Sequence, residues 1–291
     1  MKIENVLTGF IAEPRGRDGL ALAVLLARQA GARLTVATVQ PPTWHTPGPA
    51  KADESAWRAY LREQAESTLE QARELAVDAG GETEYVVHSH KGSGRGLVEL
   101  ARKRDADVVV IGSAPSGSKG RISLGSTADQ LLHASSVPVL LAPKGWAEEA
   151  PPEFERLTVA YRRGPGCDHA VGEAARAAAL LDVPLRLVTL VLSGGRRAQI
   201  ELDMIERLRD HAAADLKAAA RGQRRRVEVE VEVLEGRTVA QALRTTSWRP
   251  GEFIVCASSS SGPLRRVFLG DTSIKIVKAA TRPVMILTRE P

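Results

Sequence analysis

Short apolar runs alternate with longer amphipathic stretches along most of the chain. In the first half, the apolar runs predict strands at Val6–Phe10, Leu34–Val39, Thr83–His88, Val108–Gly112 and Val137–Ala142. Helices are expected between these strands, at Gly19–Ala30, Asp53–Ala79, Leu97–Arg104 and from Gly125 onward. Each helix would return the chain to the start of the next strand, which favours parallel pairing. The pattern therefore predicts an α/β fold.

The second half repeats this order of elements. Strands are expected at Leu157–Tyr161, Leu185–Leu192 and Val227–Leu234, and helices at His169–Leu181, Ala198–Ala220 and Val239–Ser247. The stretch Phe253–Leu287 then aligns with Val108–Ala142 without a gap, so that Gly125 falls on Gly270. An unbroken register over a whole strand–loop–helix–strand unit indicates a duplicated domain. We expect a first domain at residues 1–144 and a second domain at residues 156–291. A proline-rich, charged linker at residues 145–155 would join them.

The strand order follows from one alternating segment. Val227–Val233 reads VEVEVEV, with valine on one face and glutamate on the other, whereas a central parallel strand is apolar on both faces. This third strand of the second copy is therefore expected at a sheet edge. The sequence predicts two tandem doubly wound domains, each a five-stranded parallel sheet of order 3-2-1-4-5. The switch point of that order lies between strands one and four.

A loop rich in glycine and serine emerges at that switch point. Residues 113–124 connect the strand Val108–Gly112 to a helix that opens at Gly125-Ser126-Thr127. The N–H groups and dipole of a helix N-terminus favour an anion, so phosphate is the first ligand to consider. The alternative is a plain helix cap, in which Thr127 and Gln130 form a capping box.

With the motif, its duplication and the five-strand pattern in place, the chain resembles the universal stress protein family in its tandem-domain form, over essentially both halves. Nucleotide-binding members carry a glycine, two residues, a second glycine, nine residues, then Gly-Ser or Gly-Thr. The first copy reads Gly112, two residues, Pro115, nine residues, then Gly125-Ser126. Those members also have an aspartate at the end of the first strand, where this chain has Ile11.

The resemblance implies ATP in the first domain, with adenine against the end of the second strand near Val39. The nucleotide would be held mainly by backbone groups of Gly112, Ser113, Gly125, Ser126 and Thr127, with Lys119 or Arg121 available to the phosphates.

The second copy is expected not to bind ATP. Ala257 and Ser260 stand where the two loop glycines belong, and Asp271 stands at the position of Ser126. The aspartate carboxylate would cap the helix but repel a phosphate. Arg265 and Arg266 are expected to pair with it.

Two classes of function follow. The first is a stress-response nucleotide-binding module, and the second is a ligand-independent interaction protein in which both pockets have decayed. Slow ATP hydrolysis is a third alternative, disfavoured because Ile11 removes a carboxylate that could hold Mg²⁺. No nucleophile, base and orienting acid stand at a suggestive spacing, so we expect no enzyme. His88 and His90 could share a metal on one strand face, but no third ligand lies nearby in the sequence.

Composition and charge narrow the classes of partner that the chain is expected to bind. The net charge is +5 and the pI about 9.4, but only Arg224–Arg226 form a tight basic cluster, which does not favour nucleic-acid binding. No apolar run reaches the length of a membrane span. The two cysteines, Cys167 and Cys256, form no disulfide framework, which indicates a reducing, cytoplasmic setting.

The last strand of each copy suggests how the halves assemble. Val137–Ala142 and Pro283–Leu287 are strongly apolar, and each would lie at the sheet edge opposite the third strand. An exposed apolar edge strand tends to pair with a strand of another sheet. We therefore expect the halves to pack as an intramolecular pseudo-dimer, and a homodimer of the whole chain stays open.

Overall fold

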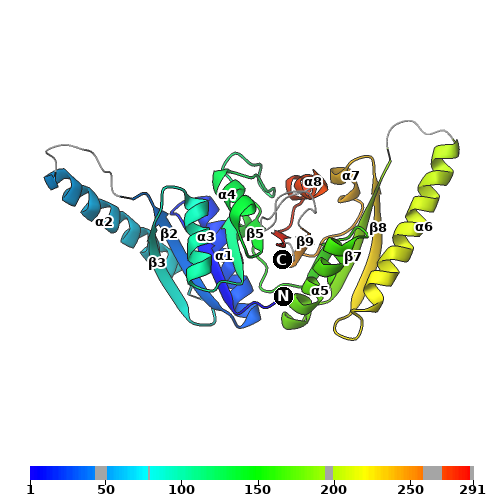
Figure 1. Cartoon of the computed structure of the whole chain (residues 1–291), viewed down its shortest axis with the longest axis horizontal. Coiled ribbons are helices and arrows are strands. Elements are labelled where there is room, and N and C mark those ends of the chain that lie inside the picture. The colour runs from blue at the N-terminus through cyan, green and yellow to red at the C-terminus, as the bar shows by residue number, and fades with distance from the viewer. Residues whose placement is uncertain (43–50, 78, 194–198, 258–270, 289–291) are drawn as a thin grey trace.

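The computed structural model describes residues 1–42, 51–77, 79–193, 199–257 and 271–288 (Figure 1). Its first half contains β1 Asn5–Gly9, α1 Pro14–Ala30, β2 Arg33–Gln40, α2 Lys51–Leu75, β3 Thr83–Ser89, α3 Ser93–Lys103, β4 Val108–Gly112, α4 Ser126–Ala134 and β5 Val139–Ala142. A short 3-10 helix, η1 Trp146–Glu148, follows. The second half contains β6 Arg156–Ala160, α5 Pro165–Leu180, β7 Leu185–Leu192, α6 Gln199–Arg221, β8 Val229–Gly236, α7 Val239–Ala242, β9 Glu252–Cys256, α8 Asp271–Ala279 and β10 Val284–Ile286.

All the strands belong to one ten-stranded sheet of order β3-β2-β1-β4-β5-β10-β9-β6-β7-β8. Each half has the predicted order 3-2-1-4-5 with parallel pairing, so the predicted fold is confirmed. The halves join through β5 and β10, which pair antiparallel with Met285 opposite Leu140. The predicted pairing of the two apolar terminal strands is therefore confirmed as well.

The helices cover both faces of the sheet. Buried side chains from α1, α2, α5 and α6 form one core layer with the sheet, and side chains from α3, α4, α7 and α8 form the other. In Figure 1, α4 and α8 lie near the junction of the halves, whereas α2 and α6 lie at the two ends. Each core layer runs through both halves, which makes the junction part of the hydrophobic core.

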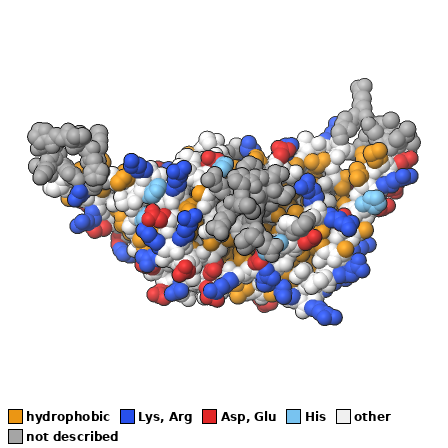
Figure 2. All heavy atoms as spheres, viewed as in Figure 1, with side chains coloured by type: hydrophobic (Ala, Val, Ile, Leu, Met, Phe, Trp, Pro, Cys, Tyr) orange, Lys and Arg blue, Asp and Glu red, His pale blue; other side chains and the backbone are white. Residues whose placement is uncertain are grey.

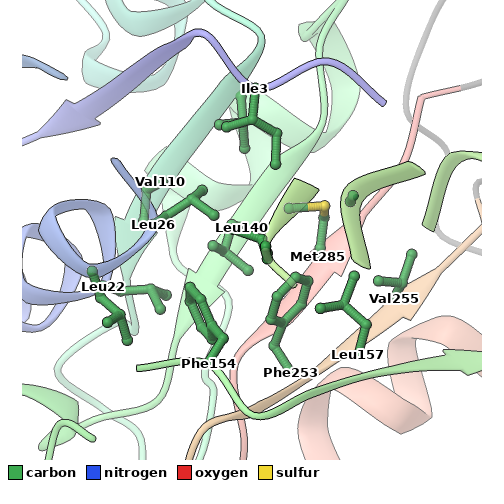
Figure 3. Close-up of a cluster of buried hydrophobic side chains, with 14 of the residues drawn as sticks. Ile3, Leu22, Leu26, Val110, Leu140, Phe154, Leu157, Phe253, Val255 and Met285 are labelled. Atoms are coloured by element: carbon green, nitrogen blue, oxygen red, sulfur yellow. The ribbon is translucent and has the colours of Figure 1, made fainter. Parts of the chain in front are cut away.

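Aromatic and aliphatic side chains fill the junction (Figure 3). The rings of Phe154 and Phe253 meet edge to face, with their centroids 4.9 Å apart, beside the fully buried Leu140 and Met285. The Gln29 side chain of α1 adds polar contacts, since its amide group bonds both backbone groups of Phe154. The same amide also donates to the carbonyl of Leu181, 2.9 Å away in the second half.

The second half holds a buried ionic cluster that the sequence pattern did not reveal. Glu252 is fully buried and accepts hydrogen bonds from Arg156, at 2.8 Å, and from Arg186, at 2.7 Å. The Arg186 guanidinium also lies 4.6 Å from the ring centroid of Trp248 and bonds Glu232 of β8. β8 is an edge strand as predicted, but its glutamate face is partly covered by these arginines. Each buried charge thus has a partner, as buried charges require.

Several helix boundaries differ from the predictions by four or five residues; α2 ends at Leu75 rather than Ala79, and α5 begins at Pro165 rather than His169. α1 begins at Pro14 rather than Gly19, because proline is well suited to the first helical position. α3 begins at Ser93 rather than Leu97, so Gly94 and Gly96 lie in its first turn. α7 ends at Ala242 rather than Ser247, where the Thr245 hydroxyl bonds the Ala242 carbonyl.

Charged side chains of both signs are interspersed over the visible face (Figure 2). Within the part of the chain that the structure describes, no helix is long and apolar enough to cross a membrane.

Replacing Met285 by alanine tests the junction. Met285 is fully buried, so the truncation should lower the free energy of unfolding by about 2–5 kcal/mol, measured by urea denaturation. Met204 on α6 is 58% exposed, so Met204→Ala should change it by no more than about 0.5 kcal/mol. Equal effects of the two substitutions would contradict the junction described here.

Candidate functional site

A cavity of about 160 Å³ opens in the first half at the carboxyl ends of β1, β2 and β4. This is the switch point of the strand order, where open α/β sheets bind their ligands. Its lining combines strand ends with the first turns of three helices: Gly9, Phe10, Ile11, Arg15, Gly16, Ala37, Val39, Ser93, Leu97, Ile111, Gly112, Ala114, Gly125, Ser126, Thr127 and Ala128.

The amino ends of α1, α3 and α4 surround this cavity. Their N-cap residues are Glu13, Gly92 and Gly125, and none of the three makes a side-chain capping bond. The first N–H groups of a helix have no partner within the helix. At α1 the N–H of Gly16 bonds the Glu13 carbonyl, and at α3 the N–H of Arg95 bonds Gln130, so the start of α4 offers most of the N–H groups left for a ligand. Three helix dipoles also place partial positive charge here. The cavity is therefore suited to an anion.

Glycines at the site allow close backbone contacts. A Cβ atom added at Gly112 would lie 1.9 Å from the carbonyl oxygen of Arg15, so α1 packs directly over the end of β4. A Cβ atom at Gly125 would lie 2.9 Å from the side chain of Ala114. Only glycine fits Gly112 without moving α1.

The starts of α3 and α4 are bonded to each other. The hydroxyls of Ser93 and Thr127 lie 2.6 Å apart, and the Gln130 amide oxygen accepts the N–H of Arg95 at 3.2 Å. The predicted capping box of Thr127 and Gln130 is therefore wrong, because Gln130 caps the neighbouring helix instead of its own. A Cβ at Gly94 would meet the Gln130 side chain at 2.6 Å, which explains a glycine inside α3.

The structure brings five of the predicted site residues together at the cavity: Val39, Gly112, Gly125, Ser126 and Thr127. Ser113 is buried and does not line it. Its hydroxyl accepts the N–H of Ser123 at 2.8 Å and thereby closes the loop onto itself. The structure thus gives Ser113 a role in shaping the loop.

The two cations expected near the phosphates contact other groups. Lys119 bonds Glu148 of η1 at 2.7 Å, and this hydrogen bond raises the pKa of the lysine. Arg121 donates to the carbonyl of Ala279, at the C-terminal end of α8 in the second half. Neither side chain lines the cavity. Lys119 and Arg121 hold the loop to the linker and the second domain in this structure.

Further contacts fasten the same loop. The Lys144 ammonium donates to the carbonyls of Pro115 and Gly117, each at 2.9 Å. The loop thus has a fixed shape although Pro115 replaces the glycine of the family motif.

Sequence reasoning missed Arg15, which lies on α1 and lines the cavity. Because the first helix was expected to begin at Gly19, no side chain of residues 13–18 was expected at the site. The one available signal was Pro14, whose fixed φ suits a first helical turn.

The histidine pair is engaged elsewhere. His88 bonds the Glu99 carboxylate at 3.1 Å, and His90 lies 2.8 Å from the backbone carbonyl of Gly92. Within the described residues, no group of three or more His, Cys, Asp or Glu side chains could hold a metal ion. The described cavity lining likewise contains no imidazole, thiol or carboxylate, so it provides hydroxyls, backbone groups and the guanidinium of Arg15 for binding.

Comparison with known proteins identifies the family. The model of the universal stress protein family matches the chain twice, at residues 3–143 and 153–288. The chain belongs to the universal stress protein family. A universal stress protein of Mycobacterium tuberculosis strain H37Rv is 32% identical over 298 aligned positions, which cover 97% of this chain and 99% of that protein. The tandem form of the family is therefore shown.

Structures of other universal stress proteins share the fold. The crystal structure of one from Archaeoglobus fulgidus covers 100% of both chains, with a TM-score of 0.66 and 16% identity. A putative universal stress protein from Pseudomonas aeruginosa covers 98% of this chain and 93% of its own, with a TM-score of 0.60 and 16% identity. At these identities, the likeness supports the architecture of the whole chain.

Replacing Gln130 by alanine tests the link between α3 and α4. The variant leaves the Arg95 N–H without its side-chain partner, so the free energy of unfolding should fall by about 0.5–1.5 kcal/mol. Gln71 on the exposed side of α2 offers a matched control, and Gln71→Ala should have almost no effect. A denaturation midpoint that Gln130→Ala leaves unchanged would contradict the capping role of Gln130.

Proposed function

We propose that this universal stress protein binds ATP or a closely related nucleotide in its first domain, residues 1–144, as a stress-response module. The observation that carries the proposal is the cavity at the switch point, where three helix amino ends meet apolar strand ends. An apolar slot beside an anion-binding edge suits a molecule with a flat base at one end and phosphates at the other.

The size and lining of the cavity indicate which part of the nucleotide each region would bind. A cavity of about 150 Å³ is known to hold a benzene molecule, so the 160 Å³ here can accept a ring-sized group. Phe10, Ala37 and Val39 line its apolar part, which suits adenine. The ribose and phosphates would extend outward over Gly125 and Ser126 at the start of α4.

We propose that binding is confined to the first domain. In the second domain, residues 156–291, α8 begins at Asp271, whose carboxylate bonds Lys275 at 2.6 Å. A carboxylate at this helix start would oppose a phosphate about 4 Å away by roughly 1–4 kcal/mol at dielectric constants of water and of a protein surface. Arg265 and Arg266, expected to pair with Asp271, lie outside the described residues.

Binding without turnover is part of the proposal. The described lining residues offer no carboxylate, imidazole or thiol to act as a general base, and Ile11 takes the place of the family's aspartate. Slow ATP hydrolysis is the less favoured alternative. A cytoplasmic location and the absence of nucleic-acid partners stay predictions.

An interaction protein is the second candidate function. One observation favours it: Trp57 and Tyr60 of α2 are 40% and 49% exposed and stack with centroids 5.4 Å apart. Large exposed aromatic side chains are typical of protein contacts. These exposed aromatic side chains could equally contact a second copy of the chain, so a homodimer stays a prediction.

Mass spectrometry of small molecules released from the freshly purified chain tests the first candidate directly, with an adenine nucleotide as the expected result. Calorimetry should then show that Gly125→Val abolishes binding, because its side chain would displace Ala114 and block the start of α4. Gly222 has no neighbouring atom within 4 Å of an added Cβ, so Gly222→Val should bind as the unmodified chain does. Full binding by Gly125→Val would show that the nucleotide is elsewhere.

The asymmetry of the halves predicts the stoichiometry. Calorimetric titration of the intact chain with ATP should give at most one site, and Asp271→Ser should leave that site in place because Asp271 belongs to the other domain. Two equivalent sites per chain would contradict the assignment.

A further inference from the structure

We infer that the first-domain site takes its nucleotide as a free anion, with the guanidinium of Arg15 in the place that a divalent cation would otherwise occupy. The inference rests on the proposed function and adds the ionic form of the ligand and the residue that selects it.

Arg15 lies at the second position of α1, immediately after Pro14. Among the described residues that line the cavity, it is the only one with a charged side chain. The backbone of the same residue packs against Gly112, the last residue of β4. The backbone of Arg15 is therefore held at the wall of the cavity by the packing of α1 on β4.

The Arg15 guanidinium has spare bonding capacity. Its Nε is shielded from solvent and makes no hydrogen bond. The Glu13 carboxylate lies 3.0 Å from Nε as an ion pair, without hydrogen-bond alignment, and both side chains are substantially exposed, at 40% and 52%. A buried donor without a partner is unfavourable. A phosphate oxygen would give the guanidinium a better-aligned partner than Glu13 does.

The cavity offers little to a magnesium ion. Mg²⁺ is held by carboxylates, phosphates and water, and the described lining residues contribute no carboxylate. Ile11, at the cavity wall, is apolar. A nucleotide-bound Mg²⁺ would also bring positive charge close to Arg15 and compete with it for the same phosphate oxygens. Free ATP has more negative charge than its magnesium complex and should therefore bind more tightly.

Glu13 sets the strength of this preference. Its carboxylate neutralises part of the Arg15 charge in the free protein, so an incoming phosphate must displace it. Removing the charge of Glu13 should strengthen nucleotide binding, whereas removing that of Arg15 should weaken it. Opposite effects from neighbouring residues distinguish a charge effect from a loss of folding.

The experiment is calorimetry of the full chain with ATP, in EDTA and in excess Mg²⁺. We expect tighter binding in EDTA. Arg15→Gln should weaken ATP binding in EDTA by at least about tenfold, as for loss of a hydrogen bond between charged groups, and Glu13→Gln should strengthen it. Arg17 is exposed, lies on the same helix and does not line the cavity, so Arg17→Gln is the matched control and should bind as the unmodified chain does.

Adenosine separates the charge effect from the shape of the cavity. Because adenosine has no phosphate, its affinity should be the same for Arg15→Gln and the unmodified chain. Binding of ATP that requires Mg²⁺, or equal affinities of Arg15→Gln and Arg17→Gln, would overturn the inference and leave the proposed function intact. An unmodified chain that binds neither ATP nor adenosine would overturn both.

Discussion

The antiparallel pairing of β5 with β10 is the contact on which the rest of the structure depends. Only three residue pairs make it, with Leu140 opposite Met285 at the centre. Both strands are fully buried, and in a separate half each would present an apolar edge with unpaired backbone groups. Pairing removes both edges at once. The edges that are left are β3 and β8, and β8 is protected by its glutamates, which is the usual way to prevent further strand pairing.

The same pairing fixes where a ligand can bind. Because β5 and β10 are antiparallel while each half is otherwise parallel, the carboxyl ends of the two sets of strands point in opposite directions. At the junction, the carboxyl end of β5 therefore lies beside the amino end of β10. This explains why Arg121, in the loop beside the cavity, reaches the C-terminal end of α8. The loop beside the first-domain cavity is thus held in part by the other half of the chain.

Much of the fold could be predicted from the sequence because it depends on local pattern. The bounds of β4 and β7 match the predicted strands residue for residue, and the glutamates of β8 correctly indicated an edge strand. What could not be predicted depends on contacts between elements. Gln130 caps α3 across space, and Glu252 is balanced by arginines from two other strands. For the same reason, Lys119 was expected at the cavity but bonds Glu148, and Arg15, for which no place was predicted, lines the cavity instead.

Hydrogen exchange at the junction tests the central claim most directly. If β5 and β10 hold the halves in one sheet, the amides around Leu140 and Met285 should be among the slowest to exchange in the chain, and the two strands should be protected to the same degree. The edge strand β3 should exchange faster. Fast exchange of β5 and β10, at rates like those of β3, would contradict the account, because it would mean that the two terminal strands do not pair with each other.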